Sequence, residues 1–259
     1  MKNLKKLEKS KGVLLFATNT ESIDYLSIAR RAERLINYYL NLPVTIVSTD
    51  TQKKNQRYSV DSGKFEQWNN YGRTSAFDIS PYDQTILIDC DYLILDNNLL
   101  KVLDTVQDYI IAKDNRFIDA DNSATMGRYS LPTVWATVIV FNKTKKSKML
   151  FDLAAKVERN FSYYQKLYNL ETNSFRNDFA FTIADNILNG YIQTPSNYLP
   201  WPIHTVANTI DSLVLTDQQL LLKTNGHGYI LPKQNLHIIS KKYLLSESCN
   251  QLIEVALGT

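Results

Sequence analysis

The sequence has few cysteines and no long apolar run, and these absences narrow the class of protein. Two cysteines among 259 residues, Cys90 and Cys249, cannot form the disulfide framework of a small secreted domain, and neither belongs to a metal-binding cysteine pair. No apolar stretch approaches the roughly 18 residues that cross a bilayer, and the polar residues 1–8 lack the apolar core of a signal peptide. We therefore expect reduced thiols and a cytoplasmic location.

Internal repeats, low-complexity linkers and a strong net charge are also missing. The formal charge is +3, with 44% hydrophobic and 21% charged residues, which is ordinary for a globular protein. Basic residues gather at 2–6, 53–57 and 143–148, where short lysine runs are more often solvated than bound to nucleic acid. A chain of this length can bury one large core, and we predict a single α/β domain over residues 1–259.

A β-α-β unit is predicted near the N-terminus. Residues 12–17 and 44–50 are short apolar runs typical of buried strands, and residues 23–36 between them repeat apolar positions near the helical period. This spacing predicts a parallel sheet with a right-handed crossover, whose ligand site lies at the carboxyl ends of the strands.

The remaining elements are read from periodicity and turn residues. The pattern predicts a short helix at 64–70, a strand through 85–96, a helix at 98–104, a strand at 108–112, a mobile loop at 116–130, a strand at 133–141, helices at 145–164 and 174–188, and a strand-like tail with strands at 228–231 and 236–239 before a closing helix from Lys241.

The most informative motif is the pair Asp89 and Asp91, which interrupts an otherwise apolar strand. Burying a charge is costly, so two acids at the end of a core strand indicate that a cation meets them there. Residues i and i+2 of a strand share a side, and carboxylate oxygens suit Mg²⁺ or Mn²⁺ with phosphate ligands. The alternative is a solvated strand end whose acids cap the next helix.

Four segments together carry a resemblance to a known class of enzymes. They are residues 16–19 (FATN), 87–91 (LIDCD), 177–180 (NDFA) and 236–242 (LHIISKK). The combination resembles the GT-A class of nucleotide-sugar-dependent glycosyltransferases over residues 13–245, and more narrowly those carried by large tailed phages. The resemblance implies a GT-A (Rossmann-like) α/β fold with a mixed, mainly parallel central sheet flanked by helices. It also implies a nucleotide-binding half at about 12–112 and an acceptor half at about 113–259.

The resemblance implies that Asp89 and Asp91 hold Mn²⁺ or Mg²⁺ against the donor diphosphate. A late histidine is the third ligand in retaining members, which matches His237, with Lys241 or Lys242 contacting the diphosphate. The family's usual glycine between histidine and lysine is missing here, and the spacing is shorter. A lone histidine on an apolar strand is most often structural. His227 is the competing third ligand.

The same resemblance implies further contacts to the donor. They fall on Thr18, Asn19 and Tyr25 for the base and ribose, on Arg73 for phosphate or base, and on Asp178 with Asn177 for the donor sugar near the reacting carbon. Turn formation, a surface arginine and a helix cap are the respective alternatives. Trp135 lies on a core strand, where packing is the ordinary explanation, but sugar rings favour aromatic faces and it is retained as a substrate candidate.

The implied reaction transfers a hexose or pentose from a nucleotide sugar, with UDP-sugars favoured, to an acceptor hydroxyl. The acceptor is a hydroxymethylated pyrimidine in DNA, in the host cytoplasm if the protein is phage-encoded, or a glycan. The pattern of His237 and Asp178 favours retention over inversion without deciding it, since inversion requires a general base toward the acceptor and front-face retention does not.

Three other functions compete with this interpretation. A haloacid-dehalogenase-type phosphohydrolase also uses Asp-x-Asp, but near the N-terminus and followed by Gly or Thr, whereas Tyr92 follows here. A sugar nucleotidylyltransferase needs a Gly-rich, Arg-containing loop that residues 18–21 lack. A non-catalytic nucleotide- or glycan-binding protein on the same scaffold is the third.

Overall fold

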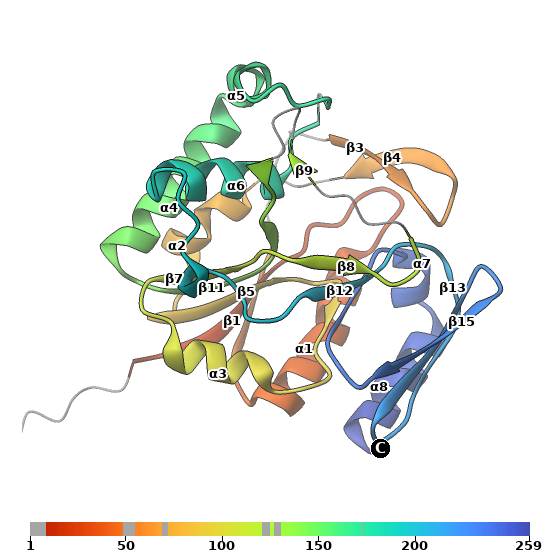
Figure 1. The fold of residues 1–259 in the computed structure, drawn as a ribbon. Coiled ribbons are helices and arrows are strands. Elements are labelled where there is room, and N and C mark those ends of the chain that lie inside the picture. The colour runs from red at the N-terminus through yellow and green to blue at the C-terminus, as the bar shows by residue number, and fades with distance from the viewer. Residues whose placement is uncertain (1–8, 49–54, 69–71, 121–124, 127–130, 173) are drawn as a thin grey trace, which may run out of the picture.

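A five-stranded sheet forms the centre of the molecule (Figure 1). The computed structural model describes residues 9–48, 55–68, 72–120, 125–126, 131–172 and 174–259. The strand order is β2 (Val44–Val47), β1 (Lys11–Phe16), β5 (Gln84–Asp89), β11 (Trp135–Asn142) and β7 (Tyr109–Ala112). Strand β1 is parallel to β2 and β5, whereas β11 is antiparallel to β5 and β7, so β11 alone runs against the other four. The predicted α/β fold class with a mixed, mainly parallel sheet flanked by helices is confirmed.

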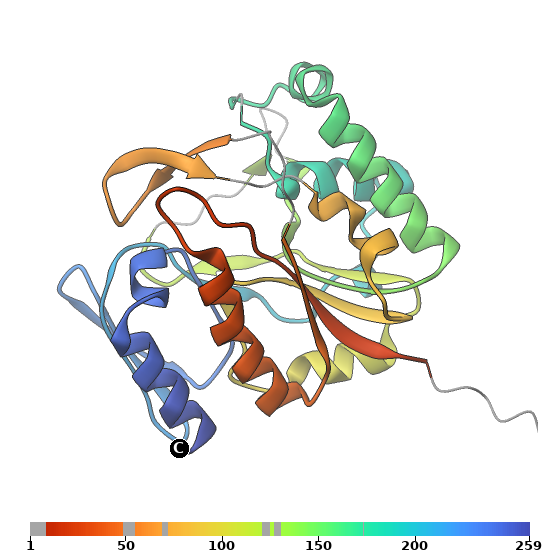
Figure 2. The same ribbon diagram turned by 180° about the vertical axis from the view of Figure 1, so that it is seen from behind.

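Helices cover both faces of this sheet (Figures 1 and 2). One face carries α1 (Tyr25–Leu40) and α3 (Asn98–Thr105), and the other α2 (Ala76–Ile79), α4 (Lys145–Arg159) and α6 (Asn177–Leu188). Alternate strand residues point to opposite faces, so Ile86 and Ile88 of β5 pack with the first group and Leu87 with the second. The continuous apolar run of β5 is therefore the sequence of a strand buried on both sides.

The first helix begins and ends where its sequence predicts. Asp24 is the N-cap, and its carboxylate accepts the backbone N–H of Ser27 at 3.0 Å. Asn41 is the C-cap in the left-handed conformation, with φ of 49°, and Pro43 follows. This boundary returns the chain directly into β2 beside β1.

A second sheet brings the C-terminal part of the chain to the carboxyl ends of β1 and β5. Its order is β6 (Tyr92–Leu93), β16 (Leu236–Ile238), β12 (Ile203–Val206) and β8 (Asn115–Phe117). In the pairing of β16 with β6, His237 lies opposite Tyr92. Residues separated by more than a hundred positions in the sequence are thus adjacent.

The remaining C-terminal strands form a separate antiparallel sheet, and two helices follow them (Figure 2). The strands are β13 (Ile210–Leu215), β14 (Gln219–Thr224) and β15 (His227–Pro232), and the helices are α7 (Lys241–Leu244) and α8 (Glu247–Leu257), of which α8 packs against α1. Two short 3₁₀ turns are η1 (Arg73–Ser75) and η2 (Pro195–Asn197). Among the described residues no helix combines the length and apolar character that a membrane crossing requires.

The predicted helix at 64–70 is wrong. Residues Lys64–Trp68 form strand β4, which pairs antiparallel with β3 (Asn55–Ser59). Gly63, with φ of +66°, completes the turn between them, since this backbone conformation favours glycine. The turn residues Asp61, Ser62 and Gly63 are the signal that identifies a hairpin here.

Three other predicted boundaries need correction. The predicted loop at 116–130 begins inside strand β8 and contains β9 (Thr125–Met126), which pairs with β10 (Leu131–Pro132), while 121–124 and 127–130 lie outside the described residues. The predicted helix at 145–164 is two helices, α4 and α5 (Phe161–Leu167), because Asn160 ends the first and precedes the second. The helix predicted from 174 begins at Asn177.

Candidate active site

A cavity of about 220 Å³ lies at the carboxyl ends of β1 and β5. The register of these strands places Phe16 opposite Asp89, so both strands end at the same edge. Both halves of the chain line the cavity, the first through Asp89 and Asp91 and the second through His237 and Lys241. Its position agrees with the edge that the β-α-β unit predicts.

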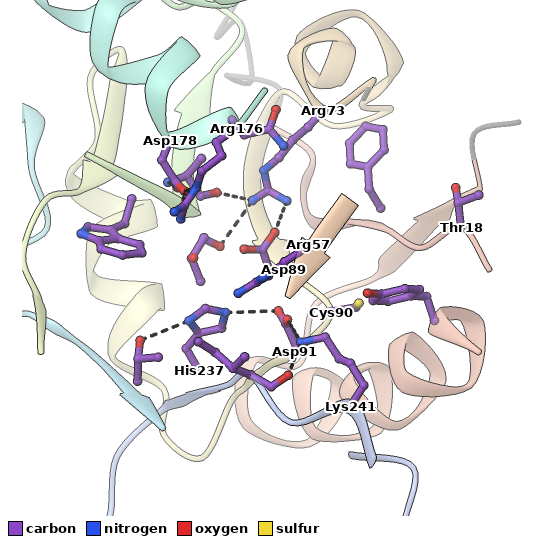
Figure 3. A pocket seen from close by; sticks show the side chains of 18 of the residues that line it. Thr18, Arg57, Arg73, Asp89, Cys90, Asp91, Arg176, Asp178, His237 and Lys241 are labelled. Atoms are coloured by element: carbon purple, nitrogen blue, oxygen red, sulfur yellow. Dashed lines mark hydrogen bonds and ion pairs between the residues drawn. The ribbon is translucent and has the colours of Figure 1, made fainter. Parts of the chain in front are cut away.

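Asp89 and Asp91 face this cavity together (Figure 3). Asp89 is the last residue of β5, and Asp91 lies in the turn between β5 and β6. The turn, rather than the pleat of one continuous strand, therefore directs both carboxylates to the same space. One ligand atom from each of Asp89, Asp91 and His237 lies within 4.8 Å of the other two. Carboxylate and imidazole ligands of this kind suit a divalent cation.

Hydrogen bonds fix the orientation of His237. Its Nδ1 lies 3.1 Å from Oγ1 of Thr205, and that hydroxyl donates its own proton to Oδ1 of Asn115 at 2.6 Å. Thr205 is therefore an acceptor toward His237, which assigns the proton to Nδ1 and leaves Nε2 as the free ligand atom. Nε2 faces Oδ1 of Asp91 at 3.5 Å. Two lone pairs facing each other need a cation between them, so these residues fit a divalent metal ion.

Two basic side chains neutralise the acids from opposite sides (Figure 3). Nζ of Lys241 lies 2.5 Å from Oδ2 of Asp91, and Nη1 of Arg73 lies 2.7 Å from Oδ1 of Asp89. Burial alone raises the pKa of Asp91, but the ammonium of Lys241 outweighs it, and the pKa is lowered. Burial raises the pKa of Asp89, and Arg73 only partly opposes this. Asp91 is thus held ionised by the protein itself, whereas the ionised form of Asp89 would be stabilised further by an added cation.

Arg73 lines the cavity from a buried position. The residue is only 4% exposed, so it is not the surface arginine that was the alternative to a phosphate or base contact. Its guanidinium donates to Asp89 and to the carbonyl oxygen of Ala136 on β11. The N–H of the same Ala136 donates to Oδ1 of Asp178 at 2.9 Å. Arg73 therefore connects the acid pair with the wall that holds Asp178.

Asp178 lies in the first turn of α6, as predicted, and lines the cavity. Its second oxygen accepts from the guanidinium of Arg176 at 2.8 Å. These two contacts thus come from Ala136 and Arg176, and not from the free N–H groups of its own helix, which a capping carboxylate would bind. Asn177 and Trp135 line the same wall, and the Arg176 guanidinium lies 5.9 Å from the centre of the Trp135 ring.

The structure brings most of the predicted residues to the cavity and leaves three outside it. Those that line it are Thr18, Tyr25, Arg73, Asp89, Asp91, Trp135, Asn177, Asp178, His237 and Lys241. Asn19 is exposed and accepts the N–H of Leu26 instead. Lys242 is exposed and does not line the cavity, and His227 is exposed at the start of β15. The donor-binding and catalytic roles of all these residues remain predictions.

Several lining residues were not predicted as part of the site, among them Arg57, Arg176 and Thr205. Arg57 on β3 belongs to a basic cluster that the sequence favoured as solvated, and Arg176 directly precedes the Asn177–Asp178 pair. Thr205 has no local signal, because its contact with His237 depends on the parallel pairing of β12 with β16.

Asp91→Asn is expected to lower the free energy of unfolding by about 3 kcal/mol, because loss of one partner leaves a buried charge uncompensated. Lys241, whose side chain is 10% exposed, keeps its charge and loses its carboxylate. Urea unfolding would measure the change, with Asp104→Asn as the comparison, since Asp104 pairs with Lys11 at the surface, where its side chain is 65% exposed. Equal losses in the two variants would contradict the buried Asp91–Lys241 pair.

Comparisons with known proteins give similarity in structure alone. No family model and no curated protein matches the chain. The structure is similar to apo GlyE, a glycosyltransferase of Streptococcus pneumoniae TIGR4, at 12% identity and a TM-score of 0.37, covering 69% of this chain and 43% of GlyE. It is similar to mouse xyloside xylosyltransferase 1 at 12% identity and a TM-score of 0.42, covering 71% of this chain and 83% of that one.

A third similar structure is a glycosyltransferase involved in glycosylation of the major capsid of PBCV-1. The identity is 10% and the TM-score 0.38, over 77% of this chain and 81% of the other. The similar structures are thus glycosyltransferases, and this chain spans less than half of the GlyE chain. At TM-scores below 0.5 these similarities carry no argument about activity, which rests on the residues of the cavity.

Proposed function

We propose that the protein is a metal-dependent glycosyltransferase of the GT-A class, which moves a sugar from a nucleotide diphosphate sugar to an acceptor hydroxyl. The observation that carries this proposal is the cluster of Asp89, Asp91 and His237 at the carboxyl edge of the sheet. Lys241 and Arg73 lie at hydrogen-bond distance from its two acids. A cation site bordered by fixed basic groups is suited to a diphosphate.

The charge of the cavity supports the same substrate class. Four permanent cations, Arg57, Arg73, Arg176 and Lys241, face three carboxylates, so the lining has a net charge of +1, which a divalent ion raises to +3. Departure of a nucleoside diphosphate places additional negative charge on its phosphates. A positive, preorganised site stabilises that charge more in the transition state than in the ground state.

Asp89, Asp91 and His237 would hold Mn²⁺ or Mg²⁺, and the ion would supply Lewis-acid stabilisation of the leaving diphosphate. Thr205 keeps Nε2 of His237 directed at the cluster. The ammonium of Lys241 is held at the same place by Asp91 and by the carbonyl oxygen of Ile239 at 2.9 Å. It is thus positioned for a phosphate oxygen beside the ion.

The wall formed by Trp135, Asn177 and Asp178 is the proposed place of the donor sugar. Both oxygens of Asp178 accept hydrogen bonds from the protein, which orients the carboxylate as an acceptor for sugar hydroxyls. A carboxylate held in this way is poorly placed as a general base toward an acceptor. This favours retention of configuration by front-face attack, which needs no such base.

The donor and acceptor follow from the resemblance. A UDP-sugar is the favoured donor, bound by residues 12–112, with residues 113–259 forming the acceptor half. A hydroxymethylated pyrimidine in phage DNA is one acceptor, and a surface or capsid glycan is the other. The DNA acceptor requires the cytoplasmic location that the sequence predicts.

Metal and nucleotide are expected to bind together, because the ion needs phosphate oxygens to complete its coordination. Isothermal calorimetry with UDP should give an affinity at least about tenfold weaker in chelator than with Mn²⁺, a change of about 1.4 kcal/mol. ADP and GDP serve as controls for the base. Equal affinity with and without metal would remove Asp89 and Asp91 from the proposed metal site.

A further inference from the structure

The β3–β4 hairpin stands apart from both sheets. Its strands pair with each other and with no other described strand. Tyr58 and Phe65 lie opposite each other with ring centres 5.8 Å apart, and both are more than half exposed. A two-stranded hairpin without a covered apolar face is marginally stable alone, so contacts with the rest of the protein decide where it lies.

This hairpin forms one wall of the candidate active site. Arg57 on β3 lines the main cavity, and a smaller cavity of about 30 Å³ lies under the hairpin. The two cavities share Tyr25, Arg57, Ile239 and Lys241 in their linings. Movement of the hairpin away from the body would therefore join them.

Asp61, in the hairpin turn, binds the segment that carries Lys241. Its Oδ1 accepts from the hydroxyl of Ser240, and its Oδ2 accepts from the backbone N–H of Lys242 at 2.8 Å. Aspartate in a turn ordinarily hydrogen-bonds the backbone of its own turn. Here both oxygens instead accept from residues about 180 positions away in the sequence. The geometry of the turn alone therefore does not explain why residue 61 is an aspartate.

Two further contacts join the hairpin to other segments. Ser22 donates to Glu66 at 3.4 Å, and Ser174 donates to the carbonyl oxygen of Gln56 at 3.5 Å, near the limit for a hydrogen bond. Bonds to a charged acceptor are the stronger kind. Asp61 therefore gives the hairpin two charge-assisted contacts with the segment that carries Lys241.

The main cavity is small for a nucleotide, so entry of such a ligand is expected to displace the hairpin. Sites for small ligands and cofactors usually measure roughly 300–1,000 Å³. The main cavity, at about 220 Å³, is smaller than this range, and the proposed donor is larger than many such ligands. Opening at the hairpin enlarges the cavity on the side of Tyr25, whereas the opposite wall is built on the central sheet.

We infer that Asp61 is a positioning residue, which closes the β3–β4 hairpin over the cavity and holds Arg57 and Lys241 on either side of a bound nucleoside diphosphate. The identity of the ligand rests on the proposed function. The contacts of Asp61 do not rest on it, because the protein's own residues make them. Breaking the two contacts of Asp61 releases the hairpin and speeds exchange of the ligand.

Hydrogen exchange and nucleotide dissociation in Asp61 variants test this inference. In Asp61→Ala without ligand, amides of residues 55–67 should exchange about tenfold faster, while those of α1 and α4 stay unchanged. UDP should dissociate about tenfold faster in the presence of Mn²⁺. Asp61→Asn should restore both to within about threefold of the wild type, because an amide accepts from Lys242 and donates to Ser240.

Asp211→Asn is the matched control, since Asp211 also accepts a backbone N–H across a turn, from Gly226, but lies outside the cavity lining. Unchanged exchange of 55–67 in Asp61→Ala would overturn the role of Asp61. Faster hydrogen exchange with unchanged UDP dissociation would show that the hairpin does not control release of the ligand from the cavity. Absence of UDP binding to the wild type would refute the proposed function instead, and the exchange data would still decide the hairpin contact.

Discussion

Asp89→Asn is expected to lower sugar transfer at least about 100-fold, the scale measured for losing a group that stabilises transition-state charge. The amide keeps the shape of the side chain but removes the charge that the cation requires. The Asp89 side chain is 36% exposed, and Arg73 keeps its contact with the carbonyl oxygen of Ala136. The variant should therefore remain folded. Loss of turnover in a variant that still unfolds cooperatively would show that the substitution affects the site and not the fold.

A carboxylate just before the other end of the same strand gives the control. Asp83 precedes the amino end of β5, whereas the cavity lies at the carboxyl end of this strand. Its carboxylate accepts hydrogen bonds from Ser10. Asp83→Asn should keep turnover near that of the wild type. Near-normal transfer by Asp89→Asn would restore the interpretation of Asp89 and Asp91 as a solvated strand end.

Asp178→Asn is expected to lower turnover about 100-fold or more with donor affinity largely kept, because the nucleotide supplies most of the binding and the carboxylate acts on the reacting sugar. The amide oxygen can still accept the N–H of Ala136, so the wall around it should keep its shape. Steady-state kinetics at saturating donor measure the effect as a change in kcat.

The alternative role of Asp178 as a favourable charge in the first helical turn makes the opposite prediction. Asparagine would then change stability by only a few tenths of a kcal/mol and leave kcat unchanged. Glu247→Gln is the matched control, because Glu247 lies in the first turn of α8, outside the cavity lining. If both variants keep full turnover, Asp178 has no part in the reaction.

The central sheet could be predicted from the sequence because its strands are buried on both faces. The runs at 12–17, 85–89 and 133–141 are apolar at nearly every position, and packing leaves such a segment few other conformations. The β3–β4 hairpin could not be predicted in this way. Its residues are mostly polar, and its position depends on the contact of Asp61 with residues 240 and 242.

The residues of the candidate site also fall into those that the sequence predicts and those that only the fold brings together. Asp89 and Asp91 are neighbours in the sequence, so their convergence could be predicted locally. His237 was suggested by the resemblance, and the pairing of β16 with β6 brings it beside Asp91. Arg57 and Thr205 reach the cavity only through tertiary structure, because the residue types alone are common on any surface. Asn19 and Lys242 were implied by the same resemblance, but both residues are exposed and do not line the cavity.

Hydrolysis of nucleotide sugars by the purified protein, across a panel of donors with Mn²⁺, tests the proposed activity most directly. At least one donor, with UDP-sugars first, should release its nucleoside diphosphate and free sugar slowly when water replaces the acceptor. This release should stop in chelator and in Asp89→Asn. Hydrolysis of simple phosphomonoesters with no release from any nucleotide sugar would contradict the proposal and identify a phosphohydrolase, and metal-dependent binding of UDP without any release would identify a non-catalytic nucleotide-binding protein.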